Sequence, residues 1–308
     1  MTRVLFAGEI NVDVIMGGME SPPVVDREVT AKSWDVVMGA STVISACAYA
    51  ALGGQASYAG LCGMDEYGEF MLRGMRERGI DTELVRRTGA ARTGVTVNMI
   101  HANTRTQVTY PGAIAEFDGS WLDSNTLAGF NHLHLGGVYL ETKLLPGVTR
   151  LLTDARGRGL TTSLDPQWDP AERWRYMDEW LPLLNFLFVN DAEAVSLAKA
   201  ASPEEACRLL AGRTAFPLVK NGRDGALMWD GSCVMRVPVR QVEPVDTTGA
   251  GDTFDAAFLY ATLDKKMQRR DAVGFANAAA ARSCLFRGGV AARSSYEDVI
   301  AFQNAPAA

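Results

Sequence analysis

A run of small residues followed by a carboxylate, near the C-terminal end of the chain, has a spacing suited to phosphate chemistry. The segment from Pro244 to Phe258 reads PVDTTGAGDTFDAAF, and its glycines run straight into a helical pattern. A turn without bulky side chains at a helix start exposes unpaired backbone N–H groups at the positive end of the helix dipole. We therefore expect the N–H groups of Gly249, Ala250 and Gly251 to hold a phosphate group during its transfer.

Asp252 follows this turn directly. Its carboxylate would compete with a bound anion for the same N–H donors, so its position makes sense if the carboxylate has a chemical role. In phosphoryl transfer a carboxylate accepts the proton of the attacking hydroxyl group. We expect Asp252 to be this general base, kept ionised at neutral pH by the helix end. The plainer alternative is a tight strand-to-helix turn followed by an ordinary helix acid.

The elements that must position this segment alternate between strands and helices. Short β-branched and aromatic runs predict strands, and each is followed by a longer helical pattern. The predicted strands span residues 4–8, 132–138, 161–165, 186–190 and 216–220, and the predicted helices span 41–52, 66–78, 144–158, 192–200 and 203–210. This alternation predicts one α/β domain over residues 1–308, with a parallel sheet covered on both faces.

Two stretches, approximately residues 12–38 and 94–111, interrupt this rhythm. Both are rich in β-formers, and the second alternates through Val95, Val97 and Met99. We expect them to form antiparallel strands of a small sheet, inserted into the α/β body as a lid. No low-complexity linker or fixed repeat divides the sequence, so the lid is expected to belong to the same domain.

Composition and charge argue against several classes of protein. The 308 residues carry a formal net charge of −6, which argues against a nucleic-acid partner or an anionic membrane surface. The five cysteines are scattered without a C-x-x-C pair, so we expect neither a disulfide framework nor a zinc site, and a reducing, cytoplasmic compartment fits best. No run resembles a signal peptide or a membrane span, so we expect neither secretion nor membrane insertion.

Other catalytic signatures are weak in this sequence. His132 and His134 alternate on one predicted strand without a third ligand in register, so we interpret them as structural rather than as zinc ligands. The sequence contains no Walker-type G-x-x-x-x-G-K-[ST] motif. No G-x-G-x-x-G follows the first predicted strand, which argues against a dinucleotide-dependent oxidoreductase.

The segment from Asp246 to Asp252 resembles the D-T-x-G-A-G-D signature of the PfkB, or ribokinase-like, carbohydrate kinase family. Five further stretches resemble motifs of this family in the same order: GEINVD at 8–13, LGG at 52–54 with GLCGMDEYG at 60–68, NDAE at 190–193, VKNGRDGA at 219–226 and FANAAA at 275–280. The resemblance implies a ribokinase-like three-layer sandwich with a central, mostly parallel sheet and a small β-sheet lid. It also implies ATP-dependent, magnesium-requiring phosphorylation of a hydroxyl group on a sugar or sugar-like molecule, with Asp252 as the base.

The same resemblance assigns roles to individual residues. The acceptor is expected to contact Asn11, Asp13, Gly39 and the lid residue Arg105. The nucleotide side is expected to include Asn190, Glu193, Lys220, Gly222, Gly225 and Asn277. Of these, Asn190 and Glu193 are implied to organise magnesium directly or through water, although the pair also fits an ordinary helix capping box.

Two further properties are implied by the family resemblance. A potassium ion is implied near the backbone carbonyls of Asp246 and Thr248, with Ser294 as a further ligand. In some members of the family the lid also forms the interface of a homodimer, and we carry this over as an expectation.

The sequence departs from the family where the acceptor is expected to bind. The substrate signature G-G-x-x-x-N-x-A reads GASTVISA at residues 39–46, so Ala40 replaces a glycine and Ile44 replaces the asparagine. Isoleucine cannot form a hydrogen bond, so the identity of the acceptor does not carry over. The stretch 165–169, DPQWD, stands where many members have D-x-N-x-R, which leaves Arg105 as a candidate for the missing arginine. Two alternatives stay open: a nucleoside kinase of this family and a non-catalytic ligand-binding relative.

Overall fold

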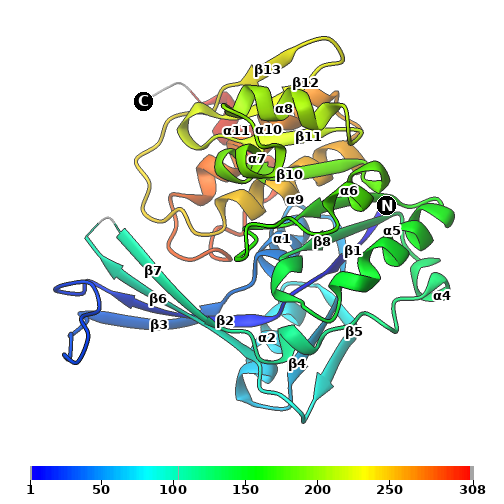
Figure 1. Ribbon diagram of the computed structural model, residues 1–308. Coiled ribbons are helices and arrows are strands. Elements are labelled where there is room, and N and C mark those ends of the chain that lie inside the picture. Colours follow the sequence, from blue (N-terminus) through cyan, green and yellow to red (C-terminus); the bar gives the residue numbers. More distant parts are fainter. Residues whose placement is uncertain (1, 103, 306–308) are drawn as a thin grey trace.

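Two sheets of different size organise the protein (Figure 1). The computed structural model describes residues 2–102 and 104–305, without the side chain of Arg105. Within these residues, nine strands form the large sheet in the order β13-β12-β11-β10-β9-β8-β1-β4-β5. They are β1 (Arg3–Ala7), β4 (Gln55–Gly63), β5 (Asp81–Thr88), β8 (His132–Gly136), β9 (Thr161–Asp165), β10 (Phe186–Asn190), β11 (Pro217–Lys220), β12 (Ala226–Trp229) and β13 (Val234–Val237).

Helices cover both faces of the large sheet. Side chains alternate along each strand, so Val4 and Phe6 of β1 enter one hydrophobic core and Leu5 and Ala7 enter the other. The first core packs under α1 (Ser41–Ala51), α2 (Glu66–Arg76), α9 (Ala250–Leu263), α10 (Arg269–Ser283) and α11 (Tyr296–Asn304), and the second under α5 (Val148–Gly157), α7 (Asp191–Ala198) and α8 (Pro203–Ala211). The expected three-layer α/β sandwich is therefore confirmed.

The sheet is mostly parallel, as expected, but its C-terminal edge is not. Strands β12 and β13 pair antiparallel to β11 and to each other, whereas the strands from β11 to β5 are parallel. A short connection, residues 221–225, joins β11 to β12, which is too short for the crossover that a parallel pair needs.

One predicted helix begins later than the sequence pattern indicates. The pattern predicts a helix over residues 144–158, but the segment starts as a 3₁₀ turn, η2 (Leu145–Gly147), and α5 begins only at Val148. Pro146 lies in this turn and has no N–H to donate into an α-helical ladder. The remaining short elements are α3 (Ala113–Glu116), α4 (Ser124–Leu127), α6 (Met177–Trp180), η1 (Val138–Leu140), η3 (Leu181–Leu183) and η4 (Gly222–Asp224).

The lid is a four-stranded sheet that projects from the body in Figure 1. Its strand order is β3-β2-β6-β7, built from β2 (Asn11–Gly17), β3 (Ser33–Met38), β6 (Gly94–His101) and β7 (Thr104–Tyr110). The expectation of a purely antiparallel lid is wrong, because β2 and β6 pair in parallel. Each of these two strands enters the lid from a strand of the parallel body sheet, β1 or β5, and so arrives in the same direction.

The two faces of the lid differ in polarity. Strand register places Asp13, Thr96 and Thr109 in one row across β2, β6 and β7, on a polar face. The opposite face carries apolar rows, namely Trp34 with Met16 and Met99, and Val36 with Val14, Val97 and Val108. In the part of the chain that the structure describes, no helix combines the length and the apolar character needed to span a membrane.

Candidate active site

A cleft of about 910 Å³ lies where the carboxyl ends of the central strands meet the polar face of the lid. Its walls come from segments far apart in the chain. Asn11, Asp13, Thr96 and Thr109 line it from the lid, and the ends of β10 and β11 and the start of α9 line it from the body. Ligands bind at this edge in open α/β sheets, because the loops there are free to carry polar groups.

A smaller pocket of about 230 Å³ adjoins this cleft. Four residues line both spaces: Lys220, Gly222, Thr247 and Gly251. The pocket reaches from these residues along α9 and α10, where Phe254, Ala280 and Ala281 add apolar surface. A polar cleft that joins an apolar pocket can hold a ligand with one charged part and one flat, apolar part.

The predicted anion turn lies at this junction. Gly249 is the N-cap of α9 with φ 75° and ψ 7°, a left-handed conformation that favours glycine. A Cβ atom on Gly249 would lie 2.8 Å from Cα of Gly289 and 2.9 Å from Cγ2 of Ile44, so a larger side chain is also excluded by space. The turn therefore presents the first N–H groups of α9 to the cleft.

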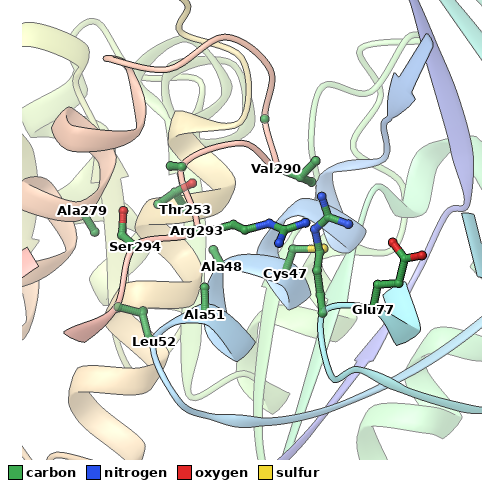
Figure 2. A pocket seen from close by; sticks show the side chains of 13 residues that line it. Cys47, Ala48, Ala51, Leu52, Glu77, Thr253, Ala279, Val290, Arg293 and Ser294 are labelled. Carbon is green, nitrogen blue, oxygen red and sulfur yellow. The ribbon is translucent and has the colours of Figure 1, made fainter. Parts of the chain in front are cut away.

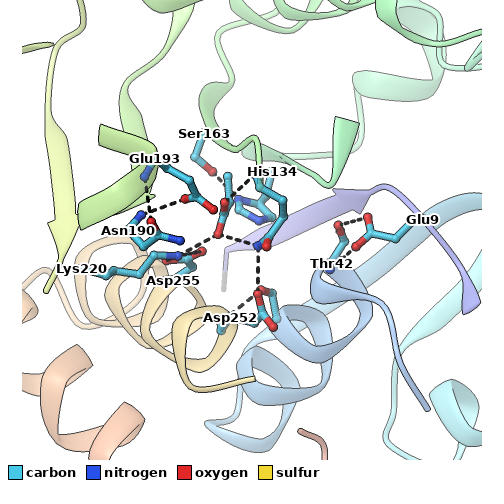
Figure 3. Close-up of polar contacts among 12 residues, drawn as sticks. Glu9, Thr42, His134, Ser163, Asn190, Glu193, Lys220, Asp252 and Asp255 are labelled. Atoms are coloured by element: carbon cyan, nitrogen blue, oxygen red, sulfur yellow. Dashed lines mark hydrogen bonds and ion pairs between the residues drawn. The ribbon is translucent and has the colours of Figure 1, made fainter. Parts of the chain in front are cut away.

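Asp252 lies in the first turn of α9 and is 8% exposed, with its side chain on the floor of the cleft (Figure 3). The side-chain amide of Gln167 donates hydrogen bonds to Oδ2 of Asp165 at 3.1 Å and to Oδ1 of Asp252 at 3.4 Å. Burial, together with the charge of Asp165, raises the pKa of Asp252 well above its usual range, and Lys220 only partly opposes this.

The direction of this pKa shift runs against the expectation that the helix end keeps Asp252 ionised. The loss of hydration around the buried carboxylate acts in the opposite direction to the field of the helix end. A carboxylate with a raised pKa binds a proton more strongly, which suits a general base.

Lys220 connects two more acids to this floor. Its ammonium Nζ lies 2.7 Å from Oδ2 of Asp165 and 3.2 Å from both carboxylate oxygens of Asp255 (Figure 3). Burial disfavours its charge, but the carboxylates of Asp165 and Asp255 raise the pKa of Lys220 above its usual value. Oxygen atoms of Asp165, Asp252 and Asp255 lie within 4.8 Å of one another, so the lysine supplies positive charge where a metal ion would otherwise fit.

Sequence reasoning placed Lys220 beside the nucleotide but missed its two acidic partners. Asp255 could have been found, because a residue three positions after Asp252 lies on the same face of a helix. The position of Asp165 beside Lys220 depends on the order of the parallel strands in the sheet, and the sequence alone does not give that order.

Asn190 and Glu193 form the capping box that we considered as the plainer alternative. The side chain of Asn190 accepts from the N–H of Glu193, and the side chain of Glu193 accepts from the N–H of Asn190, both at 2.8 Å. Both residues also line the cleft. Burial and the nearby charge of Asp165 raise the pKa of Glu193 to about 7.

The acceptor-side residues meet as expected, with one exception. The amide of Asn11 donates to Oδ1 of Asp13 at 3.1 Å and to Oγ1 of Thr96 at 3.3 Å. Gly39 contacts this pair from behind, and a Cβ atom there would lie 2.4 Å from Oδ1 of Asp13. The exception is Arg105, whose side chain lies outside the described residues.

The two departures from the family signature also lie here. Ala40 is the N-cap of α1 with φ 68° and ψ 119°, a positive-φ conformation in which the glycine of the signature would be unstrained. Ile44 lines the cleft and packs its side chain against Gly249 and Gly289. The asparagine of the family signature is thus replaced by an apolar wall.

Four of the six residues predicted for the nucleotide side lie around the 230 Å³ pocket, whereas Asn190 and Glu193 line the cleft instead. The four residues that line the pocket are Lys220, Gly222, Gly225 and Asn277. The amide of Asn277 donates to the carbonyl oxygen of Val237 at 2.9 Å, so this side chain holds the end of β13 against α10 as well as facing the pocket.

The residues implied for a potassium site are only partly brought together. Oδ1 of Asp246 accepts from the N–H of Thr248 at 2.9 Å, and Oδ2 accepts from the N–H of Gly288 at 2.9 Å. The hydroxyl of Ser294 instead accepts a hydrogen bond from the guanidinium of Arg282. A hydroxyl group that faces a guanidinium is a poor ligand for a cation, so Ser294 does not fit the implied site.

Two buried glutamates at the acceptor side were not predicted as site residues. Glu9 lines the cleft and accepts from Oγ1 of Thr42 at 2.8 Å (Figure 3). Glu141 is fully buried, and neither of its carboxylate oxygens has a hydrogen-bond partner among the described residues. Burial raises the pKa of both acids, and for Glu141 the charge of Glu9 raises it further. Glu9 could have been found, because it belongs to the GEINVD motif. Glu141 belongs to no motif and follows an apolar run, so no sequence pattern indicates a site residue there.

The histidines play the structural role that we expected. Both rings are buried, with Nδ1 and Nε2 of His132 2.7 Å from the hydroxyls of Thr161 and Ser163. Nδ1 of His134 lies 2.8 Å from the same Ser163 hydroxyl.

The fold and the cleft together define a small-molecule kinase of the ribokinase-like type, and comparisons with known proteins identify its family. The sequence model of the pfkB family carbohydrate kinases matches residues 1–294, so the chain belongs to this family.

Individual relatives are similar over nearly their whole length. An ATP-dependent ribose-1-phosphate kinase of Halopiger xanaduensis is 30% identical over 287 residues, which cover 91% of this chain and 91% of the relative. The ribokinase of Bacillus subtilis is 26% identical over 305 residues, covering 97% of this chain and all of the relative. A crystal structure from E. coli in complex with ATP and Mg²⁺ shares the fold with a TM-score of 0.86, at 22% identity and over 98% of this chain and 99% of that chain.

Proposed function

We propose that the protein transfers the γ-phosphoryl group of ATP to a hydroxyl group of a sugar or sugar-like acceptor. The observation that carries this proposal is the position of Asp252 and the Gly249 turn, where the polar cleft joins the apolar pocket. The relatives named above support it, because they are kinases named for ribose or ribose 1-phosphate.

The proposed reaction begins with the acceptor hydroxyl beside Asp252. The carboxylate of Asp252 takes the hydroxyl proton as the oxygen attacks the γ-phosphorus. The N–H groups of Gly249, Ala250 and Gly251 stabilise the negative charge on the transferring phosphoryl oxygens. Lys220 lies against the same turn, because a Cβ atom on Gly251 would be 3.3 Å from its Nζ, and it adds positive charge there.

The acceptor and the nucleotide occupy opposite ends of the site in this proposal. Asn11 and Asp13 orient the acceptor hydroxyl groups, with Gly39 behind them, and Arg105 contributes from the lid. The base and ribose of ATP lie in the pocket formed by Gly222, Gly225 and Asn277.

Magnesium fits the oxygen-rich wall of the cleft at Asn190 and Glu193. Carboxylate and amide oxygens are the ligands this hard cation prefers, usually with several waters retained. Bound magnesium would neutralise charge on the phosphates of ATP, and Asn190 and Glu193 would hold it directly or through water.

A potassium ion at the loop of Asp246 and Thr248 is part of the proposal, without Ser294. Such an ion would stiffen the loop that leads into the anion turn. If it binds there, replacing potassium with tetramethylammonium at constant ionic strength lowers kcat. An unchanged kcat removes potassium from the proposal.

We also propose that two lids pair in a homodimer. On the apolar face of the lid, Trp34 is 67% exposed, Val108 57% and Tyr110 54%, and such a face is costly to leave in water. Light scattering of the wild type is expected to give a dimer, and Trp34→Glu a monomer. A monomeric wild type contradicts this pairing.

An acceptor screen tests the function itself. ADP release is followed at fixed ATP, magnesium and potassium with pentoses, ribose 1-phosphate, hexoses, 2-keto-3-deoxy acids and nucleosides. We expect one sugar class to stimulate ADP release in the wild type and not in Asp252→Asn. ADP release that no acceptor stimulates would instead favour a non-catalytic relative.

A nucleoside kinase is the second candidate, and the apolar Ile44 wall of the cleft favours it. Stimulation of ADP release by nucleosides, and not by free sugars, would select this candidate.

A further inference from the structure

A second cavity, of about 220 Å³, lies on the other side of the active-site turn (Figure 2). Its walls come from the second half of α1, the end of α2, the sides of α9 and α10, and the loop of residues 289–294. None of the residues that line it also lines the cleft or the nucleotide pocket, as far as the described residues show. It is therefore a separate site.

Two arginines, Arg78 and Arg293, line this cavity, and neither is ion-paired with a carboxylate among the described residues. Nη1 of Arg78 donates to the carbonyl of Gly74 at 2.9 Å, but its Nε is buried and has no acceptor among the described residues. Glu77 is an acid on the cavity wall, yet no ion pair joins it to either arginine.

The thiol of Cys47, which lines this cavity, lies near the positive charges of both Arg78 and Arg293. Burial raises the pKa of the Cys47 thiol to about 12, while Arg78 and Arg293 both act to lower it. The thiol therefore stays neutral at neutral pH and does not compensate the arginines. Figure 2 shows the guanidinium of Arg293 directed toward Cys47.

We propose that this cavity binds a compact oxyanion, namely a phosphate group that is free or part of a small phosphate monoester. A buried guanidinium N–H without an acceptor is costly, and two like charges around one space repel each other. Phosphate oxygens match the planar N–H fork of arginine and would satisfy both groups. The remaining walls are small and apolar, at Ala48, Ala51 and Val290, so the polar groups of a bound anion would be held mainly by the two arginines.

The loop that carries Arg293 also supports the active-site turn. Gly289 packs against Gly249, and the N–H of Gly288 donates to Asp246 in the segment that precedes the turn. An anion held by Arg293 would restrict this loop. Binding in the cavity is then coupled to binding of the nucleotide, and the coupling free energy is the same in both directions.

Calorimetry on the nucleotide-saturated protein tests the proposal. Binding of a non-hydrolysable ATP analogue with magnesium is measured first, so that the anion turn is occupied. Inorganic phosphate and glycerol phosphate are then titrated separately. We expect at least one to bind the wild type with a Kd of about 1 mM or tighter, which corresponds to roughly −4 kcal/mol.

Variants of the same loop separate this cavity from other anion sites. Arg293→Ala is expected to weaken phosphate binding at least 10-fold, Arg293→Lys less, and Arg287→Ala, an exposed arginine outside the cavity, not at all. Arg293 is itself exposed, so its replacement leaves the fold intact, which a thermal melt verifies. Equal binding by the wild type and Arg293→Ala, or no binding by the wild type, overturns the proposal. Failure of the ATP analogue to bind contradicts the proposed function and not this site.

Discussion

The nucleotide end and the acceptor end of the active site are built in different ways. The pocket proposed for the nucleotide is lined by residues between 220 and 284 alone, on the loops that follow β11 and β13 and on α9 and α10. The acceptor end joins the lid strands with the starts of α1, α7 and α9 and with the loop after β9. The nucleotide end is thus formed by one continuous C-terminal part of the chain, whereas the acceptor end brings together segments from most of the sequence.

The two ends also differ in charge. Acids gather in the cleft, which Glu9, Asp13, Glu193 and Asp252 all line. The pocket at the nucleotide end is lined by Lys220, Arg223 and Arg240 together with uncharged polar and apolar residues, and by no acid among the described residues. In the proposed reaction, the difference assigns proton transfer to the acid-lined cleft and the positioning of the nucleotide to the other pocket.

Lys220 lies between the two ends, and its loss has the largest expected effect on stability. Lys220→Met leaves the carboxylates of Asp165 and Asp255 buried without their counter-charge, which costs about 3–5 kcal/mol in the free energy of unfolding. Urea denaturation measures this loss. The control is Lys143→Met, which removes an exposed ion pair with Glu116 and should cost less than about 1 kcal/mol. Equal losses in the two variants would show that the buried ion pairs do not stabilise the fold.

Replacing the base should affect the acceptor end without affecting the nucleotide end. Asp252→Asn removes the proton acceptor but keeps the shape of the side chain, so kcat is expected to fall roughly 10²-fold or more. The KM for ATP should change by a small factor only. Steady-state kinetics provide both values, with Asp271→Asn on the outer part of α10 as control. Near-normal turnover of Asp252→Asn would exclude this residue as the base.

The polar face of the lid offers a second way to separate the two ends. Asp13→Asn replaces a charged hydrogen-bond acceptor, and a hydrogen bond to a charged group contributes about 1.5–3 kcal/mol, so the KM for the acceptor should rise roughly 10-fold or more. The KM for ATP is expected to stay unchanged. A parallel increase in both constants would mean that the two ends do not act separately.

The pH dependence of stability should come from the acid-rich end. Since the pKa of Glu193 is raised from 4.5 to about 7 by burial and by Asp165, the folded protein keeps a proton that the unfolded chain releases. The stabilising contribution is complete below pH 4.5 and is lost as the pH rises through about 7. Nearby Asp191 acts in the same direction and Lys220 opposes it.

Glu193→Gln removes this titration, so the decrease in unfolding free energy between pH 4.5 and 7 should become smaller. Urea denaturation across this pH range measures it, with the exposed acid Glu83 replaced by Gln as control. An identical pH profile for Glu193→Gln and the wild type would place the titrating groups elsewhere.

The smallest effect is expected at the start of α1. Ala40 has φ 68° and ψ 119°, and a sparsely populated backbone conformation of this kind costs a non-glycine residue about 1–3 kcal/mol. Ala40→Gly should therefore increase the free energy of unfolding by up to about 1 kcal/mol, after the higher entropy of glycine in the unfolded chain is subtracted. A lower stability of Ala40→Gly would show that the Ala40 methyl group packs well enough to offset the strain.

The same contrast between the two ends explains how far the sequence alone could go. The alternating pattern predicted the parallel sheet and its two helical layers, and the contiguous segment around Gly249 predicted the anion turn. The parallel pairing of β2 and β6 could not be predicted, because it depends on which body strands feed the lid. The raised pKa of Asp252 arises from burial, which a local sequence pattern does not show. The ion pair of Lys220 with Asp165 joins residues that are far apart in the sequence, and the hydrogen bond of Arg282 to Ser294 joins a helix to a loop. A local pattern does not show these contacts either.

The parallel pairing of β2 and β6 has a mechanical consequence. Both strands enter the lid at one end, and β3 and β7 leave at that same end, since Val12 pairs with Met38 and Val95 pairs with Tyr110. All four lid strands are therefore connected to the body at one end of the lid, and the β6–β7 turn lies at the opposite end. A small rotation about the connected end would barely move Asp13 near that end, yet it would sweep the far ends of β6 and β7 through a wide arc.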